Sequence, residues 1–288
     1  MQIQELVPLA PRTTMRIGGS ARYYAELKTQ QDVQEAWQFA QEKSIPMIVL
    51  GAGSNTVFAD GTIEALVVTI KASALEINGT TVRAEAGLPL ATLVAKLAAH
   101  NLDLSALTGI PGTVGGATFG NAGQGPQGVW LDHFIDRVTA FADGAWRSFT
   151  RSECAFRYRE SVFKGMASPL IWEVLLEVPS RPKAEVEAEI TRLLKKRLES
   201  QPHTRTAGSC FKALPDGTPA WKAIDAAGLK GLKAGDLQVS EKHANFLINT
   251  GKGTFADVCA LIETIRTRTQ TPLALEMRLI EEAGTLLA

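Results

Sequence analysis

The sequence has few of the features that mark disulfide-rich, zinc-binding or membrane proteins. Its only cysteines are Cys154, Cys210 and Cys259, and no two of them form a CxxC spacing. Scattered cysteines argue against a disulfide framework and against zinc, and they suit a reducing cytosol. No apolar run is long enough to span a bilayer, and the first residues hold no apolar signal core. We therefore expect a soluble, cytoplasmic protein with no metal site and no membrane insertion.

Charge of one sign is not in excess either. The 30 lysines and arginines equal the 30 aspartates and glutamates, so the formal net charge is zero and a nucleic-acid partner is not expected. With 45% apolar and 21% charged residues, the composition is close to the globular average, which excludes disorder and collagen-like structure. At ~150 residues per domain, the 288 residues make one large domain or two to three small ones.

Hydrophobic periodicity predicts a chain of mixed helices and strands. We expect helices at residues 31–43, 90–100, 183–200 and 255–267, and strands at 46–50, 65–70, 75–77, 81–86, 135–142, 145–149, 170–178, 244–249 and 273–280. The pairs Asn78-Gly79 and Asp143-Gly144 predict two β-hairpins. Prolines at 179 and 182 indicate a domain boundary, and the strand–helix–strand order near the end indicates an α+β or α/β end domain.

For two of these helices the sequence also predicts the first residue or the buried face. Pro89 suits the first position of helix 90–100, where the missing N–H costs nothing. In helix 183–200, Val186, Ile190, Leu193 and Leu194 share one face, which predicts burial of that face. The many charges of the same helix predict a solvated opposite face.

A glycine turn follows the first apolar strand, in PMIVLGAGSNTVF. Gly-x-Gly after a strand suggests a dinucleotide fold, but the sixth position of that fingerprint is Thr56, and the chain leads on to Asp60 rather than into a helix. The fingerprint requires that helix, because its N-terminus holds the pyrophosphate. Gly51 and Gly53 carry no Cβ, so their backbone N–H groups could still approach a phosphate. A tight structural turn is the alternative.

Glycine and proline also cluster at residues 109–128, GIPGTVGGATFGNAGQGPQG. Five glycines from Gly109 to Gly120, with Thr113 and Asn121 as donors, predict a long loop that cradles a phosphate or the edge of a ring. A flexible surface loop is the alternative. Apolar side chains at 110, 114 and 119 interleave with the glycines, which favours a packed loop.

Two further motifs admit a functional and a structural interpretation. In CAFRYRESVFKG, Arg157 and Arg159 flank Tyr158, and a guanidinium can bind a carboxylate or phosphate in bidentate fashion; a surface strand with ion pairs is the alternative. In RTAGSCFK, Ser209 lies in no Gly-x-Ser-x-Gly elbow and has no triad spacing, so by itself it indicates a turn serine. Cys210 beside it is expected to be a buried, small apolar residue.

The last two motifs are equally open. Lys242, His243 and Asn245 precede an apolar strand, and a single histidine without a second one at metal spacing is more often structural. In LALEMRLIEE, period-two alternation places Glu276 and Arg278 on the same face. They form either a solvated pair or, if Glu276 lies in a cleft, a site where its pKa rises and it acts as an acid.

The order of these motifs is more specific than any one of them. TTMRIGG, GAGSN, GIPGTVGG with NAG, YRES, AGSCFK, QVSEKHANF and LEMR follow one another from about Thr13 to Ile280. In this order and spacing the chain resembles the UDP-N-acetylenolpyruvoylglucosamine reductases, flavoenzymes of peptidoglycan precursor synthesis. The resemblance implies an α+β chain: an FAD-binding fold of the vanillyl-alcohol-oxidase (PCMH) type in two subdomains, residues 1–66 and 67–180, and a C-terminal α/β substrate domain, residues 181–288.

The resemblance also implies cofactors and partners. FAD is bound non-covalently, NADPH is the co-substrate, and UDP-N-acetylglucosamine enolpyruvate is reduced to UDP-N-acetylmuramate by a monomer. The residues that match the family's flavin-binding positions are Gly51, Gly53, Ser54 and Asn55 in one turn, and Gly112, Thr113, Val114, Gly115, Gly116, Asn121 and Gly123 in the other segment. A flavin oxidase of the same fold, or a nucleotide-binding module without catalysis, remains the alternative.

A catalytic trio follows from the same resemblance, namely Arg159, Ser209 and Glu276. Hydride passes from flavin N5 to C3 of the enol ether, and charge develops on the substrate carboxylate. Arg159 and a protonated Glu276 would stabilise that charge, and Ser209 would deliver a proton to C2. The residues that match substrate-lining positions are Tyr158, Lys212, Lys242, His243 and Asn245.

The chain departs from the family pattern at several positions. Ala213 stands where the family usually has a substrate-binding asparagine, and Arg12 stands where it has an asparagine. The family's usual tyrosine after NAG is missing, and Gln124-Gly125-Pro126 stands there. A single helix links residue 178 to Ser209, which leaves no room for the tyrosine-bearing loop of one subclass. The chain thus resembles the subclass without that loop, and we expect a less enclosed substrate.

Overall fold

A computed structural model describes residues 1–125 and 128–287; residues 126–127, in the glycine-rich segment, and 288 lie outside the described part. The chain divides into two compact units, each made of several stretches of sequence. Unit 1 comprises Met1–Ile3, Ala25–Ala52 and Leu66–Arg197, and unit 2 comprises Gln4–Tyr24, Gly53–Ala65 and Leu198–Ala288.

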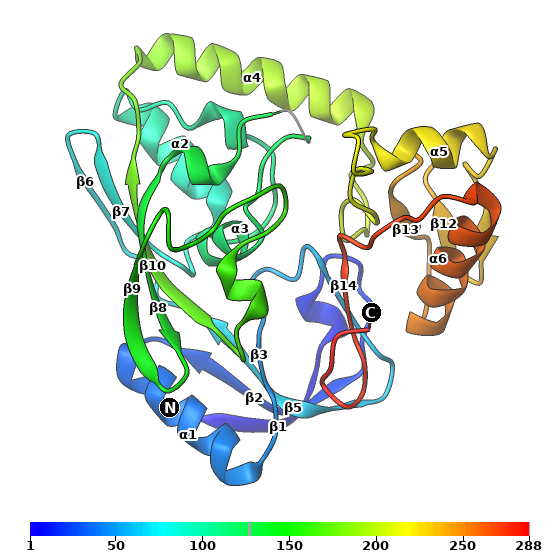
Figure 1. The fold of residues 1–288 in the computed structure, drawn as a ribbon, viewed down its shortest axis with the longest axis horizontal. Helices are drawn as coiled ribbons and strands as arrows, with labels where there is room; N and C mark the ends of the chain where they lie inside the picture. The colour runs from blue at the N-terminus through cyan, green and yellow to red at the C-terminus, as the bar shows by residue number, and fades with distance from the viewer. Residues whose placement is uncertain (126–127, 288) are drawn as a thin grey trace. The chain divides into compact units, whose positions relative to one another are not determined.

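The main sheet of unit 1 has five strands in the order β6-β7-β10-β8-β9, and its paired strands run antiparallel (Figure 1). The strands are β6 (Leu75–Asn78), β7 (Thr81–Glu85), β8 (Ile135–Ala142), β9 (Ala145–Thr150) and β10 (Leu170–Glu177). Both predicted hairpins are confirmed. Asp143 and Gly144 have φ of 52° and 79°, the left-handed pair that a two-residue hairpin turn requires.

Three helices lie in or largely in unit 1 beside this sheet. They are α2 (Leu90–Ala99), α3 (Val114–Phe119) and α4 (Lys183–Ser200). The short α3 lies inside the segment that the sequence predicted as a loop, so that prediction is wrong for six residues. Its pattern of Val114, Ala117 and Thr118, all buried, is helical, and the two glycines within the helix and those that flank it concealed the pattern.

A four-stranded sheet in the order β1-β2-β5-β3 contains residues of both units. Its strands are β1 (Ile3–Pro8), β2 (Ser20–Leu27), β3 (Met47–Val49) and β5 (Thr62–Ile70). In unit 1, helix α1 (Gln30–Lys43) begins with a reciprocal capping box between Thr29 and Asp32 and buries Val33, Ala36 and Ala40. The predicted helix 31–43 and the predicted strands 46–50 and 65–70 are confirmed, whereas the sequence predicted neither β1 nor β2.

Unit 2 contains a three-stranded antiparallel sheet of β11 (Lys233–Ala234), β12 (Leu237–Val239) and β13 (Leu247–Asn249). It also contains α5 (Ala220–Ala226), α6 (Phe255–Thr269), and a parallel pair of β4 (Thr56–Phe58) and β14 (Arg278–Ile280). Helix α6 is confirmed; the carboxylate of Asp60 accepts the Phe255 N–H at 2.9 Å at its start. The sequence predicted neither α5 nor the short β11 and β12.

Three expectations about these elements need correction. Only residues 278–280 of the predicted strand 273–280 form a strand, because that is the part paired with β4. Pro89 is the N-cap of α2 rather than its first helical residue. On α4 only Val186 is buried, and Leu194 is 40% exposed, so the predicted buried face is buried at one end only. Among the helices described, none is long and apolar enough to cross a membrane.

Candidate functional site

Two of the predicted glycine segments meet at one small cavity of unit 1. The cavity is about 40 Å³ and receives Gly51, after β3, together with Thr113, Gly115 and Gly116 at the start of α3. The remaining lining residues are Leu50, Ile70, Ala86, Phe119, Pro169 and Ile171. The structure thus joins residues that the sequence assigned to the same cofactor from two separate motifs.

At the start of α3 the backbone donors are already bonded to the protein. The Thr113 hydroxyl caps the helix by accepting from Gly116 N at 3.3 Å. Val114 N donates to Leu88 O and Gly115 N to Ala86 O, both at 2.9 Å. This segment therefore offers a ligand its glycine surface and the Thr113 hydroxyl proton, because the backbone N–H groups of residues 114–116 are already bonded within unit 1.

Space beside the glycines differs from one position to the next. A Cβ on Gly115 would lie 2.8 Å from the Ala86 Cβ, so glycine is needed there for packing inside unit 1. A Cβ on Gly116 would meet nothing closer than the Thr113 hydroxyl at 3.5 Å, and Gly116 is exposed. A Cβ on Gly51 would lie 3.0 Å from the same hydroxyl. Open space is therefore adjacent to Gly116.

The turn Gly51–Asn55 differs from the start of α3 in the hydrogen bonding of its backbone N–H groups. Within the described residues, no acceptor bonds the backbone N–H of Gly51, Ala52 or Gly53. Strand β4 follows this turn, so the absence of the fingerprint helix is confirmed. Successive free amides in a glycine turn form a site for a phosphate oxygen, which fits a dinucleotide cofactor.

Gly53 is also required by its own unit. Its φ is +65°, and a Cβ there would overlap the carbonyl oxygen of Arg12. Thr14 N donates to Gly53 O at 3.1 Å, which ties the turn to the TTMRIGG segment. The two explanations that the sequence left open, a phosphate turn and a tight structural turn, are therefore compatible here.

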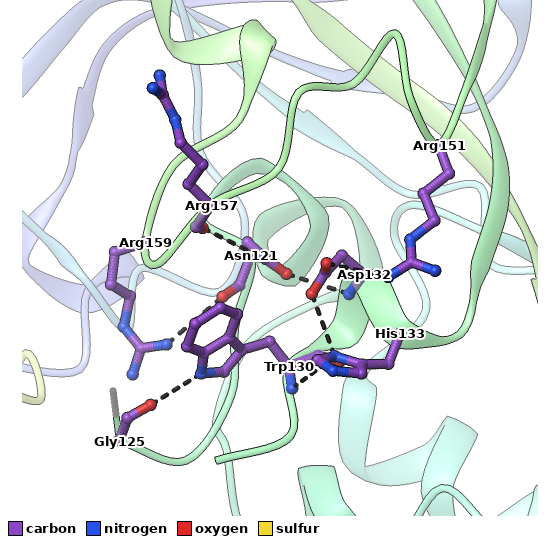
Figure 2. Close-up of polar contacts among 8 residues, drawn as sticks. All are labelled: Asn121, Gly125, Trp130, Asp132, His133, Arg151, Arg157 and Arg159. Carbon is purple, nitrogen blue, oxygen red and sulfur yellow. Dashed lines mark hydrogen bonds and ion pairs between the residues drawn. The ribbon is translucent and has the colours of Figure 1, made fainter. Parts of the chain in front are cut away.

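Arg159 lies in a turn of unit 1, not in the surface strand that was the alternative (Figure 2). Its backbone is left-handed, with φ of 55°. Its guanidinium Nη2 donates to Gly123 O at 2.9 Å, and Nη1 reaches Asn121 O at 3.4 Å. The guanidinium carbon is also 5.2 Å from the centre of the Tyr158 ring. These contacts give Arg159 a defined direction.

Asn121 and Gly123, both predicted to bind the flavin, are buried in the same cluster. The Asn121 amide donates to Arg157 O at 3.1 Å and accepts from Asp132 N at 3.1 Å. A Cβ on Gly123 would overlap Trp130. The expectation that Asn121 is available as a donor to a ligand is wrong, because its side chain is fully buried and bonded within unit 1. Sequence reasoning assigned no role to Trp130 or Asp132, and no local signal marks them.

Ser209 and Glu276 both belong to unit 2, where three short segments adjoin. The Cys210 backbone connects the three segments: its N–H donates to Asn245 O at 2.8 Å, and its carbonyl accepts from Glu276 N at 2.9 Å. Ser209 pairs with Phe246 in an isolated β-bridge. Cys210 is 1% exposed, so the expected buried, small residue is confirmed, and burial raises the pKa of its thiol.

Two more asparagines bond the backbone beside these residues. Asn55 Nδ2 donates to Glu276 O at 2.9 Å, and Asn55 O accepts from Arg278 N at 3.0 Å. The Asn245 amide is buried and bonds both backbone groups of Phe211: it accepts from Phe211 N at 3.0 Å and donates to Phe211 O at 2.8 Å. Both asparagines therefore hold unit 2 chain segments, whatever else they contact.

The other predicted substrate residues of unit 2 also bond their own unit. Lys242 Nζ donates to Leu198 O at 2.5 Å. His243 Nδ1 accepts from Asn245 N at 3.3 Å, and its ring centre lies 4.8 Å from that of Phe246. Burial lowers the pKa of this imidazole. Lys212 is half-buried and donates its N–H to Ala274 O at 2.8 Å.

The predicted catalytic trio is therefore divided by unit. Arg159 belongs to unit 1, and Ser209 and Glu276 belong to unit 2. The Cys210 backbone links the last two directly. Neither unit by itself contains all three residues.

Two known protein families match this chain, one over its first half and one over its last third. Residues 21–148 match the family described as "FAD binding domain", and residues 201–283 match "UDP-N-acetylenolpyruvoylglucosamine reductase, C-terminal domain". The UDP-N-acetylenolpyruvoylglucosamine reductase of Carboxydothermus hydrogenoformans is 40% identical over 271 residues, which cover 92% of this chain and 88% of the relative. That of Aquifex aeolicus is 36% identical over 292 residues, with 97% and 95% covered.

Solved structures agree with the sequence relatives. The crystal structure of UDP-N-acetylenolpyruvylglucosamine reductase from Thermus caldophilus has a TM-score of 0.85 and 31% identity, and covers 97% of this chain and 99% of that chain. The predicted fold class is confirmed, since a flavin-binding part and a C-terminal domain follow one another in a mixed α+β chain.

Proposed function

Because the chain belongs to the UDP-N-acetylenolpyruvoylglucosamine reductase family, we propose that it reduces UDP-N-acetylglucosamine enolpyruvate to UDP-N-acetylmuramate with FAD and NADPH. The reaction serves peptidoglycan precursor synthesis. Similarity extends over both units, so the proposal concerns the whole chain rather than one domain.

The observation that supports the proposal best is the pair of glycine segments around one cavity. The Gly51–Gly53 turn has three backbone N–H groups with no acceptor in the described part of the chain, and the start of α3 has open space beside Gly116. A flavin dinucleotide has a pyrophosphate that can accept hydrogen bonds from these donors. It also has a flat ring system that can pack against the glycine surface at the start of α3. When bound, the flavin supplies the hydride chemistry between a nicotinamide and an enol ether.

The chain's own residues supply charge stabilisation and a proton. Addition of hydride at C3 of the enol ether places negative charge on C2 and the adjoining carboxylate. The Arg159 guanidinium and a protonated Glu276 stabilise that charge. Ser209 delivers a proton to C2; a hydroxyl is a weak acid, which is sufficient for a strongly basic carbon or a relayed proton.

Several finer points belong to the same proposal. One cleft serves NADPH and the enolpyruvyl sugar nucleotide in turn, so the kinetics are ping-pong with inhibition by excess of either. The residues proposed to line the sugar nucleotide are Tyr158, Lys212, Lys242, His243 and Asn245. The protein acts as a cytoplasmic monomer, with subdomains at 1–66, 67–180 and 181–288.

A direct test is the colour of the purified protein. We expect it to be yellow, to bleach with NADPH under nitrogen, and to regain colour with the enolpyruvyl substrate. Recovery with oxygen alone, at a catalytic rate, indicates the flavin oxidase alternative. Colourless protein that still binds nucleotide indicates the non-catalytic module.

Ser209→Ala separates the two halves of the reaction. Bleaching by NADPH should keep its rate, since Ser209 acts only on the second substrate. Colour recovery with the enolpyruvyl substrate should slow ~10²–10⁴-fold, the usual loss for a positioned acid. Stopped-flow absorbance measures both, with circular dichroism as the folding control. Equal slowing of both halves would show damage to flavin binding, and an unaffected second half would remove Ser209 from the mechanism.

A further inference from the structure

Two short segments of unit 1, residues 119–123 and 157–161, are joined by side-chain hydrogen bonds at both ends. At one end the Ser161 hydroxyl donates to Phe119 O at 2.7 Å. At the other the Arg159 guanidinium donates to Gly123 O at 2.9 Å. Between them the Asn121 amide donates to Arg157 O at 3.1 Å. Arg159 is thus the only one of these donors that the proposed mechanism also assigns to the substrate.

The turn that carries Arg159 needs support from outside. Arg159 has a left-handed φ of 55°, a backbone conformation that is unfavourable for an L-residue other than glycine, asparagine or aspartate. Arg157 and Glu160 exchange two backbone hydrogen bonds, of 3.1 and 3.0 Å, which close the turn. Lys164 Nζ bonds the Arg159 carbonyl. The Asn121 amide adds a second donor to Arg157 O, at the first residue of this turn.

Asn121 is suited to support the Arg157–Glu160 turn and is not placed to contact a ligand. Its side chain is 0% exposed, and its φ of 42° is a conformation that asparagine tolerates. Oδ1 accepts from Asp132 N at 3.1 Å, so the amide links the chain at residues 121, 132 and 157. Asp132 in turn is held by Arg151, whose Nη2 lies 3.4 Å from its carboxylate.

Figure 2 shows the consequence for the two arginines. The Arg157 side chain points away from Asn121, whereas the Arg159 guanidinium turns back toward the Asn121 carbonyl. Trp130 lies on the same side: its indole N–H donates to Gly125 O at 2.8 Å, and its ring centre is 5.7 Å from that of Tyr158. The direction of Arg159 therefore depends on the turn that Asn121 holds.

We propose that Asn121 is a positioning residue for Arg159: its buried amide fixes the Arg157–Glu160 turn and so directs the guanidinium at the carboxylate of the enolpyruvyl substrate, and it is not a flavin ligand. The proposal rests on the proposed function for the identity of that substrate. The geometry of the turn itself does not depend on it.

Asn121→Asp tests the proposal with the smallest change. It keeps the size, the left-handed preference and the acceptor for Asp132 N–H, but it sets a carboxylate oxygen against Arg157 O. Asn249→Asp is the matched control: Asn249 is 3% exposed in unit 2, and its amide donates to Met15 O at 2.9 Å. Ser161→Ala removes the neighbouring bond of the same two segments and leaves the Arg157 carbonyl bonded.

In the holoenzyme we expect N121D to retain flavin content and the rate of bleaching by NADPH, and to slow colour recovery with the enolpyruvyl substrate about 10²-fold, as misplaced catalytic groups do. The double variant N121D with Arg159→Ala should be no slower than R159A, since Asn121 acts through Arg159. Additive losses, loss of flavin, or wild-type rates in N121D would each overturn the proposal.

A readout without substrate or flavin completes the test. In flavin-depleted protein, phenylglyoxal should modify Arg159 several-fold faster in N121D than in the parent, N249D or S161A, as measured by mass spectrometry of the peptide. An unchanged rate contradicts the proposal. If N121D does not fold, Asn121→Gly suits the φ of residue 121 and carries the same measurements. If the parent reduces no enolpyruvyl substrate, the proposed function fails, while the phenylglyoxal result still decides whether Asn121 holds Arg159.

Discussion

The two glycine segments use the same residue for opposite purposes. Among the residues that the structure describes, no acceptor bonds the backbone N–H groups of Gly51, Ala52 and Gly53, whereas at the start of α3 the N–H groups of residues 114–116 are all bonded within the chain. The first segment therefore offers hydrogen bonds, and the second offers space. Glycine count alone does not distinguish the two, because the distinction lies in where the neighbouring acceptors are.

Gly53→Ala is expected to have the largest effect on the fold. The new Cβ would overlap Arg12 O at a φ of +65°, so we expect a loss of about 3 kcal/mol or more in the free energy of unfolding, or insoluble protein. Gly79→Ala is the control, since its φ is +60° but nothing lies within 4 Å, and we expect only about 1 kcal/mol. Urea unfolding measures both. Equal losses would show that the overlap with Arg12 is relieved without cost.

Gly116→Leu is expected to remove the flavin without harming the fold. The nearest atom to a Cβ there is the Thr113 hydroxyl at 3.5 Å, and leucine favours a helix more than glycine does. Flavin content, read from the visible spectrum, should fall at least tenfold while the melting temperature of the flavin-depleted protein holds. Gly165→Leu, with nothing within 4 Å, is the control and should remain yellow. A fully yellow G116L would show that this cavity does not hold the flavin.

Gly115→Val separates packing from cofactor contact at the neighbouring glycine. Its Cβ would lie 2.8 Å from the Ala86 Cβ, so we expect the flavin-depleted protein itself to be destabilised by roughly 1–3 kcal/mol, unlike G116L. Thermal unfolding of both variants without flavin makes the comparison. If G115V is as stable as the parent yet colourless, glycine at 115 serves the cofactor directly.

A change of pH acts on the two units in different ranges. Burial lowers the pKa of His243 in unit 2 below its usual 6.5, so the folded state resists protonation, and stability present above pH 6.5 is lost as pH falls through the folded pKa. In unit 1, burial opposes but hydrogen bonds from Ser105 and Arg181 outweigh it, lowering the pKa of Asp103 below 3.8. That contribution is lost only at much lower pH.

The measurement is the urea midpoint at pH 7.5 and at pH 5.5. We expect a small loss on acidification that His243→Gln reduces and Asp103→Asn leaves unchanged. An equal loss in H243Q and the parent would mean that other groups cause it.

Local sequence was sufficient for elements whose signals are self-contained. Helix α1 carries its own capping box at Thr29 and Asp32, and the Asp143-Gly144 hairpin carries its own left-handed turn, so neither needed distant information. The prediction of strand 273–280 was wrong for most of its length, because a strand also needs a partner from elsewhere in the chain. Its alternation extends over eight residues, but only residues 278–280 find a partner strand, in β4.

The order of motifs was sufficient for family and fold class, and the sequence by itself also singled out both glycine segments that meet at the cavity of unit 1. Tertiary structure decided what each polar side chain bonds. Asn55, Asn121 and Asn245 were all predicted as ligand contacts, yet each bonds backbone: at Glu276, at Arg157 and at Phe211. A short amide satisfies whichever carbonyl and N–H the fold brings within about 3 Å. Those partners lie 34 to more than 200 positions away in sequence, where no local pattern can show them.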